Sequence, residues 1–512
     1  MITIKDYLFR RPMLLSAILC VITVIIGYYF KAALVIMALL FILLLFFIIL
    51  KKPSSAISIA IIFPILVSIS AINTFNEIEK ANSLIGKEAN AIFCVTDITH
   101  ESENYFIADI KIKDSDILNK GDRLSFSYYK NNLTIGDTFK ATIKLQKIDN
   151  KYRLSSYSNK IFLMANAKDY TLLKGEENFI LKQTDKLRRY IKQTLFSNMG
   201  YEQAATMSAL TFSEDKYFSA EFKNNVKTAG VSHVMVVSGM HLSVLITLMG
   251  FFTEKLFYNR FIKALFILLS VFLMSFLCGF TMSILRAGVT YILYSVALLL
   301  NRKPVGENCL GAAVCLIMLF SPLSIFSLAL QLSVLSTFGI LAIAIPCCRF
   351  ITENEFIKAK LVNTFLSAVI VCVSATLMVY PLLIYVYGSI STVGIITTLL
   401  ISYPVTVAIW ITVIALILNP FFDFLAGALL FVCNAIIGYV NYTINKMASL
   451  PNALIETPKS MSVVVCVIII LIFCVMLACK KHIDMLKLNK VLEKIKSEGG
   501  KSLKWQSSQS KN

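Results

Sequence analysis

The sequence predicts a polytopic α-helical membrane protein of about twelve spans, with one small extracytoplasmic β-barrel domain inserted between them. Three observations support this fold class. Hydrophobic residues make up 57% of the chain and charged residues only 15%, whereas soluble domains usually carry about 25% charged residues. Many apolar runs are long enough to cross a bilayer as helices. One polar stretch has the period-two alternation of short strands. The composition excludes an ordinary soluble enzyme, a disordered protein and a collagen-like fibre.

The N-terminal region, residues 1–75, contains three apolar runs that we expect to be spans, at 13–29, 33–50 and 56–72. Its basic start would also suit a cleaved signal peptide. However, no small-residue cleavage site follows the first run, and the second run begins at once. We therefore interpret the first run as an anchored span.

Residues 76–175 alternate apolar and polar side chains in five short segments. Turn signals at Gly121-Asp122 and Gly136-Asp137 precede two of these segments. Several short strands in so short a stretch favour a small barrel, with the OB-fold as the leading candidate. The strand candidates are 89–95, 105–112, 123–128, 138–145 and 160–165.

The segment 176–230 predicts amphipathic helices that are too polar to span the membrane. Helices of this kind lie in the membrane interface and contact lipid. The first has an apolar face around Ile191 and Leu195. We expect its basic residues to face away from that side; they are Lys186, Arg188, Arg189 and Lys192.

Residues 231–479 are mostly apolar and predict a helical channel domain. The run at 306–320 is short for a full span, and the run at 393–418 could form two broken pieces. The expected spans are 231–252, 261–279, 281–300, 306–320, 323–346, 362–387, 393–418, 424–447 and 461–479.

Basic residues gather in every second loop, which predicts that both termini lie inside and that the barrel domain lies outside. The tail at 480–512, with nine Lys against three acidic residues, is then a basic cytosolic segment. Much of the formal net charge of +19 follows from this distribution. The charge alone is therefore no argument for binding DNA.

Several kinds of chemistry are not expected. The twelve cysteines include no CxxC pair, and all but Cys94 lie in or beside apolar runs. The chain contains no phosphate-binding loop, HExxH, EF-hand or dinucleotide fingerprint. We therefore predict no metal site, no cofactor and no ATP hydrolysis by this chain.

Polar residues within the predicted spans form four sets, and such residues usually face a bundle interior or an aqueous path. Each set has a plainer explanation as hydrogen bonding between helices. Arg286 could also snorkel to the membrane surface, and Ser238 with His241 could form a hydrolase pair, although no acidic residue is near them in sequence. We predict a polar pathway lined by His233, Ser238, Gly239, His241, Ser283, Arg286, Gln331, Asn434, Asn441 and Asn445.

The same segments resemble the ComEC competence family. Residues 230–242 are similar to its G-x-S-H-x-x-x-x-S-G-x-H signature, and residues 279–287 to its G-x-x-x-S-x-x-R-A segment. Residues 321–340 resemble its D-P…F-Q-L-S…G-I stretch, although Ser321 stands where the family has Asp. Weaker matches follow in the family's order, at Tyr380-Pro381, Gly388, Ser402-Tyr403-Pro404 and Leu450-Pro451.

The resemblance implies a channel in the bacterial cytoplasmic membrane that imports one strand of transforming DNA. It also implies that the OB-like domain contacts DNA. Cys94 has no partner for a disulfide in the outer domain, and no HxHxDH of the family's metallo-β-lactamase-like domain occurs in this sequence. We therefore expect a separate DNA receptor, a cytosolic ATPase motor and a nuclease as partners, and a homo-oligomer stays an open alternative.

Two other functions are kept beside this one. A secondary transporter or exporter of a small polar solute could use the same polar sets, although no clear internal repeat supports it. A membrane-embedded enzyme would need His233, Ser238 or His241 to form a nucleophile and base pair.

Overall fold

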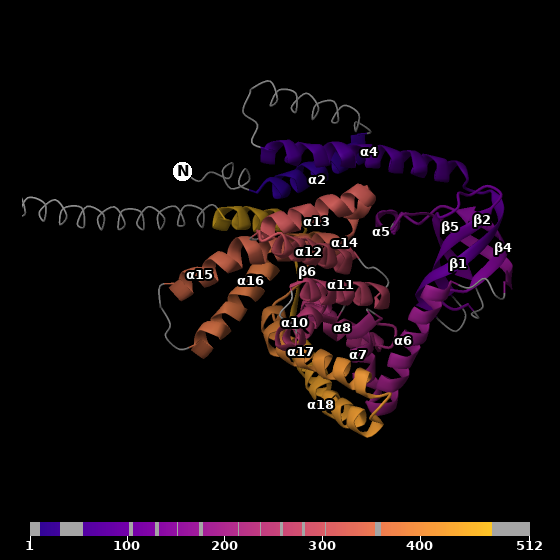
Figure 1. Cartoon of the computed structure of the whole chain (residues 1–512). Coiled ribbons are helices and arrows are strands. Elements are labelled where there is room, and N and C mark those ends of the chain that lie inside the picture. The colour runs from indigo at the N-terminus through magenta and orange to yellow at the C-terminus, as the bar shows by residue number, and fades with distance from the viewer. Residues whose placement is uncertain are drawn as a thin grey trace, which may run out of the picture.

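The computed structural model describes residues 11–30 and 55–473, apart from short gaps at 102–105, 129–132, 151, 174–177, 213, 236, 257–259, 279–281, 303 and 354–359. Figure 1 shows a pair of N-terminal helices, a barrel at one end of the molecule, and a bundle of helices beside both. The predicted span at 33–50 and the basic tail lie outside the described residues.

The N-terminal pair consists of α2 (Pro12–Phe30) and α4 (Ser55–Ser83). Both pack against α13 (Gly306–Phe320), and a side chain at Gly311 would place its Cβ only 2.4 Å from the backbone of Met13. The predicted span at 56–72 is part of the longer helix α4, which continues to the barrel (Figure 1). The helix α4 thus runs without a break from the N-terminal apolar region to the barrel.

Five strands form the closed barrel in the order β1-β2-β3-β5-β4, with β1 paired to both β2 and β4. All pairs are antiparallel except β3 with β5, and this order is that of an OB-like barrel. The short helix α5 (Arg153–Ser158) precedes β5. The strands are β1 (Glu88–Glu101), β2 (Phe106–Ser115), β3 (Arg123–Tyr128), β4 (Thr138–Gln146) and β5 (Ile161–Leu172). The predicted barrel is confirmed.

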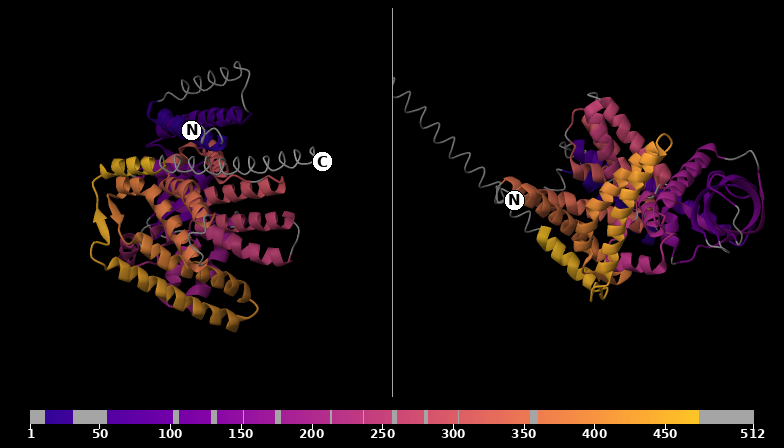
Figure 2. Two further views of the ribbon diagram at one scale, coloured as in Figure 1. Left: turned by 90° about the vertical axis from the view of Figure 1, so that its left-hand side faces the viewer. Right: turned by 90° about the horizontal axis from the view of Figure 1, so that it is seen from below.

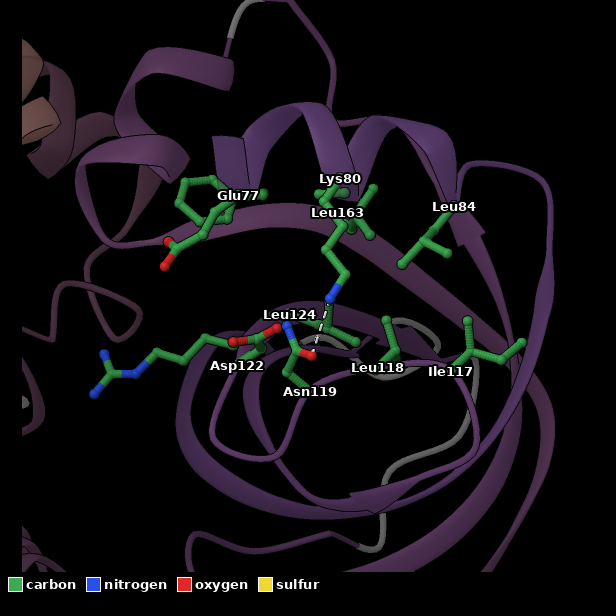
Figure 3. Close-up of a pocket in the computed structure, with 12 residues that line it drawn as sticks. Glu77, Lys80, Leu84, Ile117, Leu118, Asn119, Asp122, Leu124 and Leu163 are labelled. Carbon is green, nitrogen blue, oxygen red and sulfur yellow. Dashed lines mark hydrogen bonds between the residues drawn. The ribbon is translucent and has the colours of Figure 1, made fainter. Parts of the chain in front are cut away.

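The barrel closes around the apolar halves of its alternating strands. Phe93, Phe126 and Phe139 are fully buried and their rings touch. Gly121 and Gly136 have φ of +99° and +90°, so both predicted turns need glycine. The end of α4 covers one opening of the barrel, and a small pocket remains between them, where Lys80 donates to Asn119 at 3.2 Å (Figure 3).

The segment 176–230 forms helices that pack against the helix bundle, and its position at the membrane interface stays a prediction. It forms α6 (Phe179–Asn198), α7 (Tyr201–Phe212) and α8 (Ala220–Thr228). Most of α7 is buried, because its small residues allow neighbouring helices to approach closely. Figure 1 shows α6 running from the barrel along the bundle toward α18.

The bundle proper begins at the short helix α9 (Ser232–Met235). Its longer helices are α10 (Gly239–Leu256), α11 (Arg260–Leu277), α12 (Met282–Leu299), α13, α14 (Leu328–Gly339), α15 (Ile345–Glu353), α16 (Lys360–Tyr387), α17 (Gly394–Leu418) and α18 (Asp423–Ala448). Among the described residues, five helices are long and apolar enough to cross a membrane, and shorter apolar helices accompany them. The predicted helical membrane fold is confirmed, whereas the count of about twelve spans stays a prediction.

Two of the expected spans differ from the prediction. The span expected at 231–252 is broken after Met235, and α10 starts anew at Gly239. The span expected at 323–346 begins as a 3₁₀ helix (Pro322–Phe326) and contains a π-helical turn (Ile340–Ala344) before α15. Period-based reasoning finds apolar runs but not such local breaks, which often occur at functional sites.

A two-stranded ribbon of β6 (Ser389–Ser391) and β7 (Leu454–Glu456) was not predicted. It is visible as a pair of arrows in the left-hand view of Figure 2. Gly230 has φ of +72° and lies against Ser391, where a Cβ would come within 2.6 Å of the serine Cβ. Ser391 in turn donates to the carbonyl of Thr228 at 2.8 Å. The ribbon therefore fixes the chain just before the break at α9.

Candidate functional site in the helix bundle

Three helices bring together a polar group that we call the arginine centre: Gly239 of α10, Ser283 and Arg286 of α12, and Ser333 of α14. The side chain of Arg286 donates from Nε and Nη2 to the hydroxyl of Ser333, at 3.1 and 2.8 Å. The hydroxyl of Ser283 lies 3.3 Å from that of Ser333. The centre thus joins residues about fifty positions apart in sequence.

The guanidinium of Arg286 also lies against the first residue of α10. A Cβ built on Gly239 would be only 2.7 Å from Nη2 of Arg286. Only a residue without a side chain leaves the guanidinium where it is. The backbone of α10 begins at this point, and a helix start carries unpaired N–H groups.

Arg286 is only 7% exposed, so it points into the bundle and does not snorkel out of it. In the described part of the chain, no carboxylate lies within ion-pair distance of Arg286. A guanidinium has five N–H donors, and one serine hydroxyl cannot satisfy them. A buried cation without a counter-charge is costly, so this position suits a site that water or a passing anion reaches.

Ser238 and His241 form a cap at the start of α10. The amide N–H of Ser238 donates to Nδ1 of His241 at 3.1 Å, and the serine hydroxyl lies 3.2 Å from the same nitrogen. Nδ1 therefore accepts, and the neutral ring carries its proton on Nε2. His241 is fully buried, and its Nε2 has no hydrogen-bond partner among the residues that the structure describes.

His233 lies on α9, separated from His241 by the break in the chain. It is exposed, although Val231, Val234 and Met235 around it are all buried. The ring thus faces accessible space from within a buried segment. The two histidines do not share one regular helix, contrary to the predicted continuous span.

Gln331 lies on α14 close to Ser333 in sequence, but its side chain bonds outside the arginine centre. Its Nε2 donates to the carbonyl of Ile325 at 2.7 Å, which holds the 3₁₀ helix against the start of α14. Ser333 is the residue of α14 that reaches Arg286, and the sequence prediction did not include it among the site residues. Helical spacing groups residues on one helix and gives no sign of which one meets another helix.

The asparagines of α18 contact the helices that precede the bundle. The side-chain oxygen of Asn441 accepts from Thr206 Oγ1 at 3.0 Å, and that of Asn434 accepts from the amide of Gly200 at 2.8 Å. Asn445 accepts from Asn225 Nδ2 at 3.0 Å. These bonds join α18 to α7 and α8, and they are the helix-packing contacts that were the alternative explanation of this set. A place for these asparagines on a pathway stays a prediction.

The basic residues of α6 do not share one free face. Arg188 is buried, in contrast to the prediction, because it reaches acceptors on α11. Lys192 pairs with Glu214 at 2.6 Å, and burial holds the pKa of Lys192 below its usual range although Glu214 opposes this shift. Lys186 and Arg189 are exposed, and Arg189 pairs with Asp185 on the same helix.

Comparisons with known proteins place these segments in a family. The family model described as competence protein matches residues 210–482, more than half of the chain. ComE operon protein 3 of Bacillus subtilis (strain 168) is 25% identical over 165 residues, which are 32% of this chain and 21% of that protein. An uncharacterized protein of Mycoplasma pneumoniae (strain ATCC 29342 / M129 / Subtype 1), named as the MG316 homolog, is 35% identical over 113 residues, or 22% of this chain and 29% of that protein.

The chain thus spans less than a third of the length of either of these curated relatives. No solved structure matches it. The arginine centre and the cap at Ser238 both lie within the matched residues. The resemblance found in the sequence is confirmed: the chain belongs to the competence protein family.

Proposed function

We propose that the chain is a transmembrane channel that imports single-stranded transforming DNA across the bacterial cytoplasmic membrane during natural competence. Membership of the competence protein family supports the proposal, as does the closed OB-like barrel beside an apolar helix bundle. OB-folds bind single strands in many proteins.

The observation that carries the proposal is the burial of Arg286 without a carboxylate partner in the described part of the chain. A DNA strand is a chain of phosphate anions, and Arg binds phosphate through parallel N–H donors. The hydroxyls of Ser283 and Ser333 add donors beside the guanidinium. A strand that passes the arginine centre would bring phosphate anions to Arg286, which has no carboxylate partner among the described residues.

We place Ser238, Gly239, Ser283 and Arg286 on the path, and His233 beside it. Gly239 serves the path by leaving room for the guanidinium. His233 is exposed next to the break that precedes α10. His241, Gln331 and the asparagines of α18 remain candidates, and their side chains bond to other parts of the protein.

The enzyme alternative has one observation in its favour, the contact of 3.2 Å between Ser238 Oγ and His241 Nδ1. A base that activates a serine needs a free lone pair and an orienting partner on its other nitrogen. Here Nδ1 already accepts from the amide of Ser238, and no described residue bonds to Nε2. The geometry therefore favours a helix cap over a nucleophile and base pair.

We propose that the barrel lies outside the cell and that both termini lie in the cytosol. The distribution of basic residues supports this orientation. A cysteine placed at the exposed Ser155 tests it with a thiol reagent that cannot cross the membrane. Labelling of intact cells supports an outer barrel, and labelling only after lysis would reverse the topology.

We also propose that import depends on a separate DNA receptor, a cytosolic ATPase motor and a nuclease. The sequence contains neither a phosphate-binding loop nor an HxHxDH motif. The purified protein should accordingly release no phosphate from ATP and cut no DNA. Metal-dependent cutting that is lost with His233→Ala or His241→Ala would return the enzyme alternative to first place.

Arg286→Ala tests the proposal in cells that depend on this protein for transformation. We expect loss of labelled-DNA import, while DNA bound at the cell surface and the amount of membrane protein stay normal. Arg286→Lys keeps the charge but not the fork of donors, so it should retain part of the import. Normal import by Arg286→Ala would remove the arginine centre from the path. A solute carrier would instead transport a small polar molecule and show no dependence on DNA.

A further inference from the structure

The helix α6 links the barrel to the bundle through one buried arginine. Arg188 is 6% exposed and donates from Nε to the carbonyl of Leu277 at 2.9 Å. Its Nη2 reaches the carbonyl of Phe276 at 3.4 Å, and its Nη1 lies 3.5 Å from the carboxylate of Asp97. The first two acceptors belong to the last turn of α11, and the third to strand β1 of the barrel.

Both acceptors on α11 are carbonyls of its last turn, which take donors from outside the helix. A cation at this end also interacts favourably with the helix dipole. The planar fork of Arg can reach two carbonyls and a carboxylate at once, which a Lys ammonium cannot do from one place. Arg188 thus satisfies the end of α11 and holds it to the barrel with the same side chain.

The end of α11 leads directly to the arginine centre. Leu277 is the last residue of α11, and α12 begins at Met282, one position before Ser283. Cys278 is also held in place, because its thiol donates to the carbonyl of Thr211 at 3.3 Å. α11 also packs directly against α12, where a Cβ on Gly288 would come within 2.7 Å of Val271. A shift of α11 would therefore be felt by α12, which carries Ser283 and Arg286.

We propose that Arg188 is a positioning residue that couples the barrel to the arginine centre, by fixing the end of α11 against Asp97. A displacement of the barrel relative to α6 breaks the contact with Asp97 and leaves Arg188 and the end of α11 free to move together away from the barrel. The inference rests on the proposed function, because the arginine centre is the site that it positions.

Titratable groups near the contact between Arg188 and Asp97 make the barrel side of this contact sensitive to pH. Asp109 of β2 is the strand partner of Asp97 and lies near Arg123 of β3. On the other side of the contact, Lys192 of α6 interacts with Arg188 and with Glu214 and Lys216 of the loop after α7. Burial, and then repulsion from Asp97, raises the pKa of Asp109 to about 6, although Arg123 opposes this shift. Burial also raises the pKa of Asp97 against the opposing effect of Arg188.

The sign of the pH dependence follows from these directions. A carboxyl whose pKa is raised in the folded barrel binds its proton more tightly there than in water. The barrel is then most stable below the ordinary pKa of Asp, and it loses stability as the pH rises through about 6. Asp109→Asn removes this cost, so the strands that hold Asp97 should become more stable at neutral pH and less sensitive to pH.

Hydrogen–deuterium exchange on the full-length protein in lipid nanodiscs tests the coupling without DNA. In Arg188→Gln we expect about tenfold faster exchange in the last turn of α11 and the first turn of α12, after correction for intrinsic exchange. The exchange rate in Arg188→Lys should lie between those of the wild-type protein and Arg188→Gln. The matched control is Arg189→Gln, since Arg189 is exposed and pairs within its own helix. Unchanged exchange in Arg188→Gln would overturn the inference.

The pH profile separates positioning from general loosening. In the wild-type protein, the corrected exchange in β1 should rise between pH 5 and pH 7, and the end of α11 should follow it because Arg188 joins the two. Asp109→Asn should flatten both rises. A rise that persists in Asp109→Asn would contradict the assignment. Import by Arg188→Gln at normal protein level would show that the coupling does not serve the arginine centre. Cells that import DNA equally well without this protein would instead refute the proposed function itself.

Discussion

The molecule buries two arginines in different ways, one at the junction with the barrel and one inside the bundle. Arg188 is 6% exposed and reaches two carbonyls and a carboxylate. Arg286 is 7% exposed and reaches the hydroxyl of one serine. Similar burial with unequal partners indicates different tasks. Arg188 holds two regions together, whereas Arg286 has more N–H donors than the described residues have acceptors for.

Burial alone therefore does not identify a functional residue. A buried charge whose donors are matched by protein acceptors contributes to the fold, and its removal leaves those acceptors unpaired. A buried charge without such acceptors costs stability, and it is retained where something outside the protein supplies them. The acceptor set is what distinguishes Arg188 from Arg286.

The largest expected effect is the difference in stability between two variants in which one of these arginines is replaced by leucine. Arg188→Leu removes one donor from Asp97 and one from each of two carbonyls of α11, which should lower the free energy of unfolding by about 2 kcal/mol. The amide of Ile98 still donates to Asp97 at 3.0 Å. A larger loss is not expected, because the side chain of Asp97 is 38% exposed and water can solvate it. Arg286→Leu should cost far less, or even stabilise the protein, since among the described contacts only the hydroxyl of Ser333 loses this donor. Thermal unfolding of both purified variants measures this difference. Equal losses of unfolding free energy would contradict the distinction between Arg188 and Arg286.

A smaller effect is expected at Asn441, whose side-chain bonds are made within the protein. Asn441→Ala leaves the buried hydroxyl of Thr206 without this acceptor, although Thr206 also bonds to the carbonyl of Glu202. We expect a loss of about 1 kcal/mol in unfolding free energy. Import should fall only in proportion to the amount of protein. Import that is lost at normal protein level would instead place Asn441 on the path.

The smallest change in stability should come from Gly239→Ala. The new methyl group would lie 2.7 Å from Nη2 of Arg286, and the flexible guanidinium can move aside at a cost of about 0.5 kcal/mol or less. Import should still decline several-fold, because the guanidinium leaves its position. Gly250→Ala in the same helix is the matched control, since a Cβ there meets no described atom within 4 Å. An equal decline in both variants would point to a general effect on α10.

The barrel and the bundle also differ in how far their sequences predict them. Alternation along β2 and β4, with turns at Gly121 and Gly136, is a local pattern, and it correctly predicted an OB-like barrel. In the bundle, the apolar runs predicted helices, but the break before Gly239 depends on a cap made by Ser238 and His241. Hydropathy carries no information about such a cap.

Only part of the arginine centre could be predicted, because local sequence patterns do not show which helices contact each other. Ser283 and Arg286 share one helix face, so their spacing pointed to a common site. Ser333 comes from another helix, and its contact with Arg286 depends on how α12 packs against α14. The burial of Arg188 was missed because its acceptors are backbone carbonyls of α11, which have no signature in the sequence.

Water and a passing strand should both reach Arg286 inside the bundle, and Arg286→Cys tests this central expectation most directly. A small cationic thiol reagent restores a positive charge at this position, with the wild-type protein as the control for its native cysteines. We predict that the variant is inactive, that the reagent modifies residue 286 from the aqueous phase and restores part of the import, and that single-stranded DNA slows the modification. A cysteine at 286 that stays unmodified in the folded protein, or a modified variant whose import is not restored, would contradict the proposed path.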